Sequence, residues 1–206
     1  MKIACIDFEG VLVPEIWVSL AERTGIDELR LTTRDIPDYD VLMRQRLAIM
    51  RERGLRYADI QAAASALAPL PGAAEFLTWL RGHYQVAIIS DTFHELAAPL
   101  VAKLGYPVIL CHSLEVAADD TITGYRLRQL DPKRQAVRAF QSLAYQVVAT
   151  GDSYNDISML RQADVGMLFQ PSENVVRDHP DLAVARDYAE LTTMFGAALG
   201  TAPQLR

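Results

Sequence analysis

The sequence is poor in cysteine and has no long apolar segment, and both absences exclude classes of protein. Only two of its 206 residues are cysteines, Cys5 and Cys111, and each lies within an apolar stretch. This placement favours two reduced thiols in a packed core over a disulfide. The longest apolar runs are far too short to cross a bilayer, and the first ends at Asp7, which does not fit a secretory signal peptide. We therefore expect a soluble protein of the cytoplasm.

Positive charge is also scarce. The chain has 20 Lys and Arg against 26 Asp and Glu, a formal net charge of -6, and no run of basic residues. Nucleic acids and anionic membranes are bound by basic surfaces, so neither partner is expected. Hydrophobic residues make up 50% of the chain, which excludes a disordered protein. We expect small-molecule substrates as partners; a homodimer is compatible with the sequence, which leaves the oligomeric state open.

Short apolar runs alternate with amphipathic segments of helical period, a pattern typical of a parallel sheet covered by helices. The strands are expected to be buried on both faces, because their sequences are continuously apolar. They are predicted over residues 2–6, 85–90, 108–111, 146–150, 165–169 and, more weakly, 182–185. Helices are predicted over residues 72–84, 94–104, 132–145, 156–163 and 188–198. The sequence therefore predicts an α/β fold with a Rossmann-like parallel sheet.

Two stretches interrupt this alternation. Residues 14–69 contain three segments of helical period and no convincing strand, and loops of such length are rarely featureless. We interpret them as a small helical domain inserted after the first strand, with residues 1–13 and 70–206 forming the core domain. Its helices are predicted over residues 15–24, 39–53 and 58–67. The second stretch, residues 114–129, contains an acidic turn followed by a β-rich segment, which predicts a β-hairpin.

Polar side chains follow several of the predicted strands. In an open α/β sheet, ligands bind just beyond the carboxyl ends of the strands, so these side chains are candidates for a common site. They are Asp7 and Glu9 after the first strand, Ser90 and Asp91 after the second, and Asp152, Ser153, Asn155 and Asp156 after the fourth.

Several carboxylates at one sheet edge predict a cation site. Asp7 and Glu9 are two residues apart, so in extended backbone both side chains leave on the same side, where they repel unless a cation or a shared proton lies between them. A turn or capping cluster would explain Asp7 alone. Asp152 and Asp156 at another strand end favour a hard, oxygen-preferring cation, and Mg²⁺ is the usual one beside phosphate. A zinc site is not expected, because the four histidines lack ligand spacing with the cysteines.

Ser90 and Lys133 each fit two roles. Ser90 ends a predicted strand, where its hydroxyl is suited to cap the next helix, and Thr92 with Glu95 has capping-box spacing there. Lys133 lies in the first turn of a predicted helix, where a cation opposes the helix dipole by roughly a few tenths of a kcal/mol. A lysine beside free N–H groups also forms a phosphate cradle. The sequence does not distinguish the adjacent Arg134 from Lys133.

Arg46 is predicted to point into the apolar face of the helix over residues 39–53, whereas Arg44 and Arg51 fall on its solvated face. A buried arginine requires an anionic partner. That partner is either an acid of this chain, Glu15 or Glu22, or a substrate carboxylate, which suits the planar guanidinium. In the second case Arg46 and Glu15 together would hold the carboxylate and ammonium groups of an amino acid.

Four segments resemble, in order and in strand-end placement, the motifs of the haloacid dehalogenase-like phosphohydrolases. They are Asp7-Phe8-Glu9-Gly10-Val11, Ile88-Ile89-Ser90, Lys133 and Gly151-Asp152-Ser153-Tyr154-Asn155-Asp156. The helical insert resembles the cap domain of the phosphoserine phosphatase branch of this family. Glu15 and Arg46 occupy the places of the residues that bind the substrate ammonium and carboxylate in that branch.

The resemblance implies a role for each of these residues. Asp7 would be the nucleophile that forms an aspartyl phosphate, and Glu9 the general acid and base. Asp7, Asp152 and the backbone carbonyl of Glu9 would hold Mg²⁺, while Asp156 would anchor the loop or orient metal-bound water. The residues that would bind phosphate or substrate are Glu15, Arg46, Ser90, Asp91, Lys133 and Asn155.

Two residues depart from the usual pattern of the family. Glu9 stands where most members have a second Asp, and Asp91 stands where many phosphoserine phosphatases have Gly. Both features, with residues 13–15 and 34–40, resemble phosphoserine phosphatases that also transfer phosphate to homoserine. The resemblance therefore implies an enzyme that passes phosphate from phosphoserine to water or to homoserine, and it leaves open which acceptor predominates and whether Glu9 determines the choice.

Two other functions fit parts of the sequence. The same chemistry would serve another small phosphate monoester, such as a sugar or nucleotide phosphate, and Arg46 would then belong to an internal ion pair. A phosphate-accepting signalling module also has acidic strand ends. Receiver domains, however, are shorter and carry the phosphorylated Asp on an internal strand, whereas Asp7 follows the first predicted strand.

Overall fold

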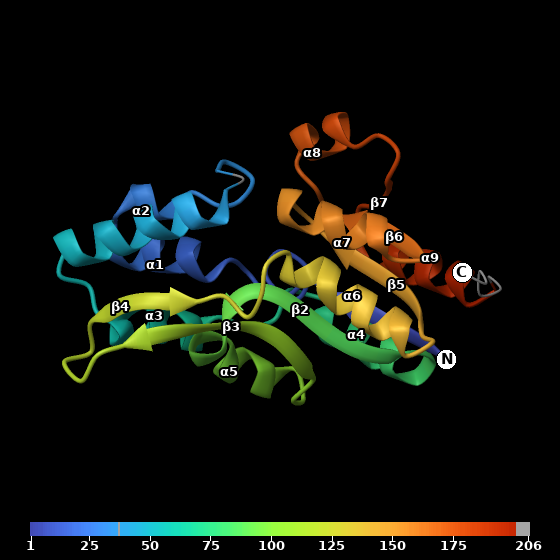
Figure 1. Ribbon diagram of the computed structural model, residues 1–206, viewed down its shortest axis with the longest axis horizontal. Coiled ribbons are helices and arrows are strands. Elements are labelled where there is room, and N and C mark those ends of the chain that lie inside the picture. The colour runs from blue at the N-terminus through green and yellow to red at the C-terminus, as the bar shows by residue number, and fades with distance from the viewer. Residues whose placement is uncertain (37, 201–206) are drawn as a thin grey trace.

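The computed structural model describes residues 1–36 and 38–200. They form a seven-stranded sheet in the order β4-β3-β2-β1-β5-β6-β7 with helices on both faces (Figure 1). Neighbouring strands are parallel except β3 and β4, which are antiparallel. The strands are β1 (Lys2–Ile6), β2 (Gln85–Phe93), β3 (Val108–Val116), β4 (Ile122–Arg126), β5 (Gln146–Gly151), β6 (Val165–Phe169) and β7 (Ala183–Ala185).

Two layers of apolar side chains enclose the sheet. Helices α4 (Ala73–His83), α5 (His94–Lys103) and α9 (Tyr188–Leu199) cover one face, and α6 (Pro132–Ser142), α7 (Ile157–Gln162) and α8 (Glu173–Asp178) cover the other. Successive side chains of a strand point to opposite faces. Accordingly β1 contributes Ala4 and Ile6 to the first layer and Ile3 and Cys5 to the second. Burial on both faces explains why the strand sequences are continuously apolar rather than alternating.

The segment between β1 and α4 is helical. Leu70 donates a backbone hydrogen bond to the carbonyl of Leu12, with 3.0 Å between nitrogen and oxygen, so the chain leaves the core and returns to it at one point. Within the segment α1 packs against α3, and α2 lies across the β3–β4 hairpin (Figure 1). These elements are α1 (Ile16–Thr24), the 3₁₀ helix η1 (Asp27–Arg30), α2 (Tyr39–Glu52) and α3 (Tyr57–Ala66). The arrangement supports a cap over residues 14–69, which stays a prediction.

The α/β class and the parallel sheet are confirmed, and the differences lie in the lengths of strands and in two short helices. β3 does not end at Cys111 but runs on to Val116 and pairs antiparallel with β4. The expected hairpin is therefore built partly from the third parallel strand, and the turn that joins its strands lies over residues 117–121. Neither η1 nor α8 was expected, because both are too short to show a helical period. In the part of the chain that the structure describes, no helix is long and apolar enough to span a membrane.

Candidate active site

The carboxyl ends of β1, β2 and β5, three neighbouring strands, meet at a small cavity of about 50 Å³. The loop that follows β5 continues as the 3₁₀ helix η2 (Tyr154–Asp156). Side chains from the sheet edge and from the inserted helices line the cavity together. They are Asp7, Glu9, Glu15, Trp17, Thr32, Thr33, Tyr39, Leu42, Arg46, Ser90, Asp91, Thr92, Lys133, Asp152, Ser153 and Asn155. Every predicted site residue except Asp156 thus lies at the cavity.

Lys133 lies between two of the expected acids. Its Nζ is 2.9 Å from Oδ1 of Asp7 and 2.6 Å from Oδ1 of Asp156, and its side chain is 2% exposed. Burial alone would lower the pKa of Lys133, but the two carboxylates raise it well above its ordinary value, so the group is an ammonium. Arg134 is exposed and donates to Oε1 of Gln162 at 3.2 Å. Of the two basic residues, Lys133 is the one that reaches the site.

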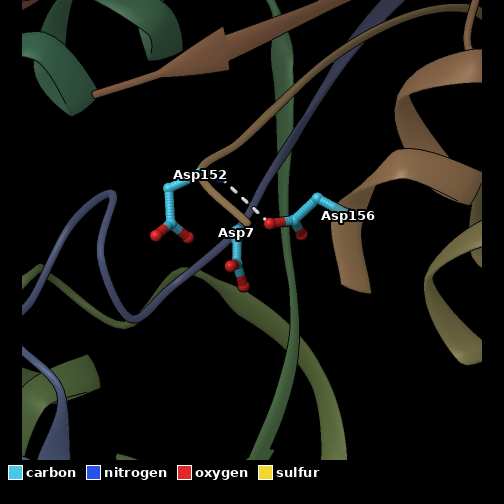
Figure 2. Close-up of side chains that lie close together, drawn as sticks. All are labelled: Asp7, Asp152 and Asp156. Atoms are coloured by element: carbon cyan, nitrogen blue, oxygen red, sulfur yellow. Dashed lines mark hydrogen bonds between the residues drawn. The ribbon is translucent and has the colours of Figure 1, made fainter. Parts of the chain in front are cut away.

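Asp7, Asp152 and Asp156 offer carboxylate oxygens that lie within 4.8 Å of one another (Figure 2). Burial and the neighbouring carboxylates raise the pKa of Asp7 well above its ordinary value and that of Asp152 to about 6. This surplus of negative charge on an all-oxygen donor set fits a hard divalent cation such as Mg²⁺. Asp156 is the weaker candidate ligand, because Lys133 binds its Oδ1 and the backbone amides of Asp152 and Ser153 bind its Oδ2 at 3.0 and 3.1 Å.

Two glycines let these carboxylates approach the backbone. Gly10 has a φ of +82°, and a Cβ there would lie 2.6 Å from Oδ2 of Asp152. A Cβ on Gly151 would lie 2.2 Å from Cγ of Asp156. Such distances are far inside van der Waals contact, so a side chain at either position would displace a carboxylate. The turn after β1 is thereby packed against Asp152, which is compatible with the expected use of the Glu9 carbonyl as a metal ligand.

Ser90 is 3% exposed and lines the cavity. Its Oγ accepts a hydrogen bond from the backbone nitrogen of Thr92 at 3.2 Å, which leaves its proton available for a bound anion. The two capping alternatives are wrong. β2 continues to Phe93, which is the N-cap residue of α5, and Glu95 accepts a hydrogen bond from the backbone of Leu114 instead.

Arg46 is buried on α2, as its place on the apolar face predicts, and is 5% exposed. One Nη donates to the carbonyl oxygen of Leu31 at 2.8 Å, and the guanidinium lies over the ring of Trp17, 4.7 Å from its centroid. Its buried Nε has no hydrogen-bond partner among the described residues. Neither Glu15 nor Glu22 lies within ion-pair distance of Arg46 in that part of the chain; Glu22 binds Arg30 instead, and Glu15 acts on Arg46 only through its charge.

Glu15 and Glu9 bring further negative charge to the cavity. Burial and the charges of Glu9 and Asp152 raise the pKa of Glu15 to about 8, although Arg46 opposes the shift. An ammonium group beside Glu15 would relieve this repulsion. The carboxylate of Glu9 accepts a hydrogen bond from the backbone nitrogen of Ile16 at 2.8 Å, at the start of α1.

Sequence reasoning missed two residues that reach the site from the loop between η1 and α2. Arg34 donates a hydrogen bond to Oδ2 of Asp152, and the hydroxyl of Thr33 donates to Oδ1 of Asn155 at 3.3 Å. The loop has no periodicity, so no signal in it indicates where a side chain points. His112, a buried residue of β3 that contacts Asp91, was missed because a single histidine in an apolar strand has no spacing partner.

The geometry gathers a buried carboxylate, a hydroxyl and an ammonium at the centre of a parallel sheet, in the order that the sequence motifs predict. The haloacid dehalogenase-like hydrolase family matches residues 9–161, and the chain belongs to this family.

Its relatives give a finer comparison. The chain is 56% identical over 195 residues to phosphoserine phosphatase ThrH of Pseudomonas aeruginosa, with 95% of each protein covered. It is also 56% identical to a phosphoserine phosphatase of Pseudomonas syringae pv. tomato, with 95% of this chain and 82% of the relative covered. A crystal structure of an apo phosphoserine phosphatase superposes with a TM-score of 0.77 at 23% identity, over 93% of this chain and 98% of that one, and this likeness shows the fold.

Proposed function

We propose that this protein is a Mg²⁺-dependent phosphoserine phosphatase that passes the phosphoryl group through an aspartyl phosphate to water or to homoserine. One observation carries the proposal: a single cavity is lined by groups suited to phosphate, Asp7, Ser90 and Lys133, and by groups suited to an amino acid, Glu15 and Arg46. The unpartnered Nε of Arg46 supports a substrate carboxylate as its missing acceptor. The names of the two Pseudomonas relatives support the same substrate.

Asp7 is the nucleophile of the proposal. Its Oδ1 accepts hydrogen bonds from the backbone nitrogen of Phe8, at 2.7 Å, and from Lys133, whereas no donor among the described residues engages its Oδ2. We assign the attack to Oδ2, which bonds to phosphorus as the bond between phosphorus and the serine oxygen breaks. Ser90 and Lys133 then donate to the phosphoryl oxygens as negative charge moves onto them.

Asp7, Asp152 and the backbone carbonyl of Glu9 are the residues that would hold Mg²⁺. When bound, the ion screens the repulsion between carboxylate and phosphate and polarises the phosphoryl oxygens. Asp156 would hold these ligands in position indirectly, because it binds Lys133 and the backbone amides of the loop after β5.

Glu9 is the general acid and base of the proposal. It protonates the departing serine oxygen and then takes a proton from the acceptor, water or the homoserine hydroxyl, as that oxygen attacks phosphorus and frees Asp7. Glu9 and Asp7 line the same cavity. The cavity of about 50 Å³ holds only a few water molecules. An amino-acid phosphate therefore enters when the cap moves, and renewed closure excludes bulk water.

The test is incubation of the protein with phosphoserine and Mg²⁺, with and without homoserine, while inorganic phosphate and phosphohomoserine are measured. We expect phosphate release that needs Mg²⁺, and phosphohomoserine when homoserine is present. Asp7→Asn should abolish both products and the base-labile, hydroxylamine-sensitive phosphoenzyme, and substantial residual turnover would remove Asp7 from its role. Hydrolysis of sugar phosphates faster than phosphoserine would contradict the proposed substrate. Failure to form phosphohomoserine at millimolar homoserine would restrict the function to hydrolysis.

A further inference from the structure

His112 lies inside the molecule at the middle of β3 and is 2% exposed. Its Nδ1 accepts a hydrogen bond from the backbone nitrogen of Arg128 at 3.2 Å, so Nδ1 carries no proton. Its Nε2 lies 3.3 Å from Oδ1 of Asp91 and therefore donates its proton there. The backbone of Arg128 thus fixes the tautomer of His112, and that tautomer is the one that can hold Asp91.

Aromatic side chains fix the orientation of the His112 ring. The ring of Tyr39 meets it edge-on, with 5.7 Å between centroids, and the ring of Phe93 lies 6.3 Å away. The hydroxyl of Tyr39 donates to the backbone carbonyl oxygen of Asp91 at 2.6 Å, so both the main chain and the side chain of Asp91 are held. A ring held in this way has little freedom to turn its Nε2 away from the carboxylate.

The second oxygen of Asp91 faces the residues that handle phosphate in the proposed function. Its Oδ2 accepts a hydrogen bond from Nδ2 of Asn155 at 2.6 Å and lies 3.9 Å from Nζ of Lys133. Burial alone would raise the pKa of Asp91, but Lys133, His112 and Asn155 together lower it below its ordinary value. Asp91 therefore stays a carboxylate that binds His112 on one side and the phosphate-handling residues on the other.

We propose that His112 is a positioning residue, which fixes the Asp91 carboxylate and through it sets the places of Lys133 and Asn155 around the phosphoryl group. His112 itself does not line the cavity. The proposal rests on the proposed function for its kinetic readout, because it concerns the same phosphoryl-transfer site. It also gives a role to the acid that follows Ser90: with His112 beside it, Asp91 binds the amide nitrogen of Asn155 and adds a third carboxylate to the two that already bind Lys133.

The test compares His112→Phe, which keeps a ring but removes the donor, with His112→Gln, whose amide nitrogen can still reach Asp91. We expect His112→Phe to lower kcat about 10- to 100-fold, the range typical of residues that orient a site from behind it. KM for phosphoserine should change little, because Glu15 and Arg46 do not contact His112. His112→Gln should recover most of the rate. A loss in His112→Gln as large as that in His112→Phe would overturn the proposal. His83→Phe is the matched control, since His83 is exposed at the far end of α4.

A double-mutant cycle gives the decisive measurement. In an Asp91→Ala background, His112→Phe should have no further effect on kcat, because the carboxylate through which His112 acts is already absent. If the two substitutions instead lower kcat by independent factors that multiply in the double variant, the proposal is overturned.

Two readouts separate this test from failure of the proposed function. Nitrogen NMR of the wild-type protein should show the Nε2–H tautomer of His112, and the other tautomer would contradict the proposal without any assay. If phosphoserine is not hydrolysed, the proposed function fails, and the same cycle is measured on p-nitrophenyl phosphate.

Discussion

Glu9 and Ile16 are joined by a hydrogen bond in which the backbone nitrogen at the start of α1 donates to the Glu9 carboxylate across 2.8 Å. The acid that follows β1 is thereby tied to the first turn of the inserted helices. An Asp at position 9 would be one methylene shorter, so it could not keep this bond and the same position at the cavity.

Two substitutions of Glu9 therefore have different expected results. Glu9→Gln removes the proposed acid and base and should lower kcat about 10²- to 10⁴-fold. Glu9→Asp keeps a carboxyl group but releases α1, and we expect a smaller loss of kcat with a changed ratio of phosphohomoserine to inorganic phosphate. The ratio is measured at fixed homoserine concentration. An unchanged ratio in Glu9→Asp would show that the length of this side chain does not influence the acceptor.

Arg46→Ala tests recognition of the substrate carboxylate. Its buried guanidinium has an unpartnered Nε, so its removal should raise KM for phosphoserine by 10-fold or more, on the order of a lost charged hydrogen bond. Hydrolysis of p-nitrophenyl phosphate, which has no carboxylate, should barely change. Arg44→Ala, on the exposed face of the same helix, is the control. Equal losses on both substrates would mean that Arg46 serves the fold of the cap.

Gly10→Ala tests the close packing of the turn after β1 against Asp152. Gly25 also has a positive φ, +70°, but a Cβ there would meet nothing within 4 Å. Gly25→Ala thus reports the backbone strain alone, whereas Gly10→Ala adds the clash with the Asp152 carboxylate, a proposed metal ligand. We expect similar losses of stability from strain in both variants, but a large loss of activity and a higher Mg²⁺ requirement only in Gly10→Ala. Full activity of Gly10→Ala would contradict this geometry.

Arg34 is expected to compete with a cation for Asp152. Its guanidinium donates to Oδ2 of that carboxylate, whose side chain is 1% exposed. Arg34→Gln should therefore tighten Mg²⁺ binding a fewfold, because no positive charge has to be displaced first. The measurement is the rise of melting temperature with Mg²⁺ concentration, with Arg23→Gln, an exposed residue of α1, as the control. Weaker Mg²⁺ binding in Arg34→Gln would show that Arg34 assists the metal site instead.

Glu15 should make substrate affinity depend on pH. Because its pKa is raised to about 8 from an ordinary value of 4.5, Glu15 is largely uncharged at pH 6 to 7, and binding an ammonium group requires it to lose a proton. KM for phosphoserine should fall as pH rises toward 8, by up to about 10-fold per pH unit. Glu15→Gln should weaken binding and flatten this dependence. A profile that is the same in both proteins would remove Glu15 from ammonium recognition.

The raised pKa of Glu15 acts in the opposite direction on the stability of the substrate-free protein, which should fall as pH rises. A group whose pKa is raised by folding contributes stability at low pH that is lost as pH rises through its folded value. Without substrate, the melting temperature should therefore fall as pH rises from 4.5 to about 8. In Glu15→Gln this fall of melting temperature with pH should be smaller.

The sequence predicts those parts of the site that follow from strand ends and helix period. Asp7, Ser90 and Asp152 could be placed together because parallel strands bring their carboxyl ends to one edge, and Arg46 could be placed in the interior because a helix has a fixed period. Arg34 and His112 could not. Arg34 lies in a loop without period, and the partner of His112 is set by the pairing of β3 with β2, which no local pattern encodes.

The pairing of β1 with β5 also determines when the proposed site can form during synthesis. Ile6 pairs with Thr150, so Asp7 meets Asp152 only after most of the chain has left the ribosome and the two distant strands have docked side by side. During this interval Asp7 lacks the neighbours with which it would form the proposed site. If Asp7 and Asp152 act together as proposed, chains that end before β5 are expected to be inert toward phosphate esters.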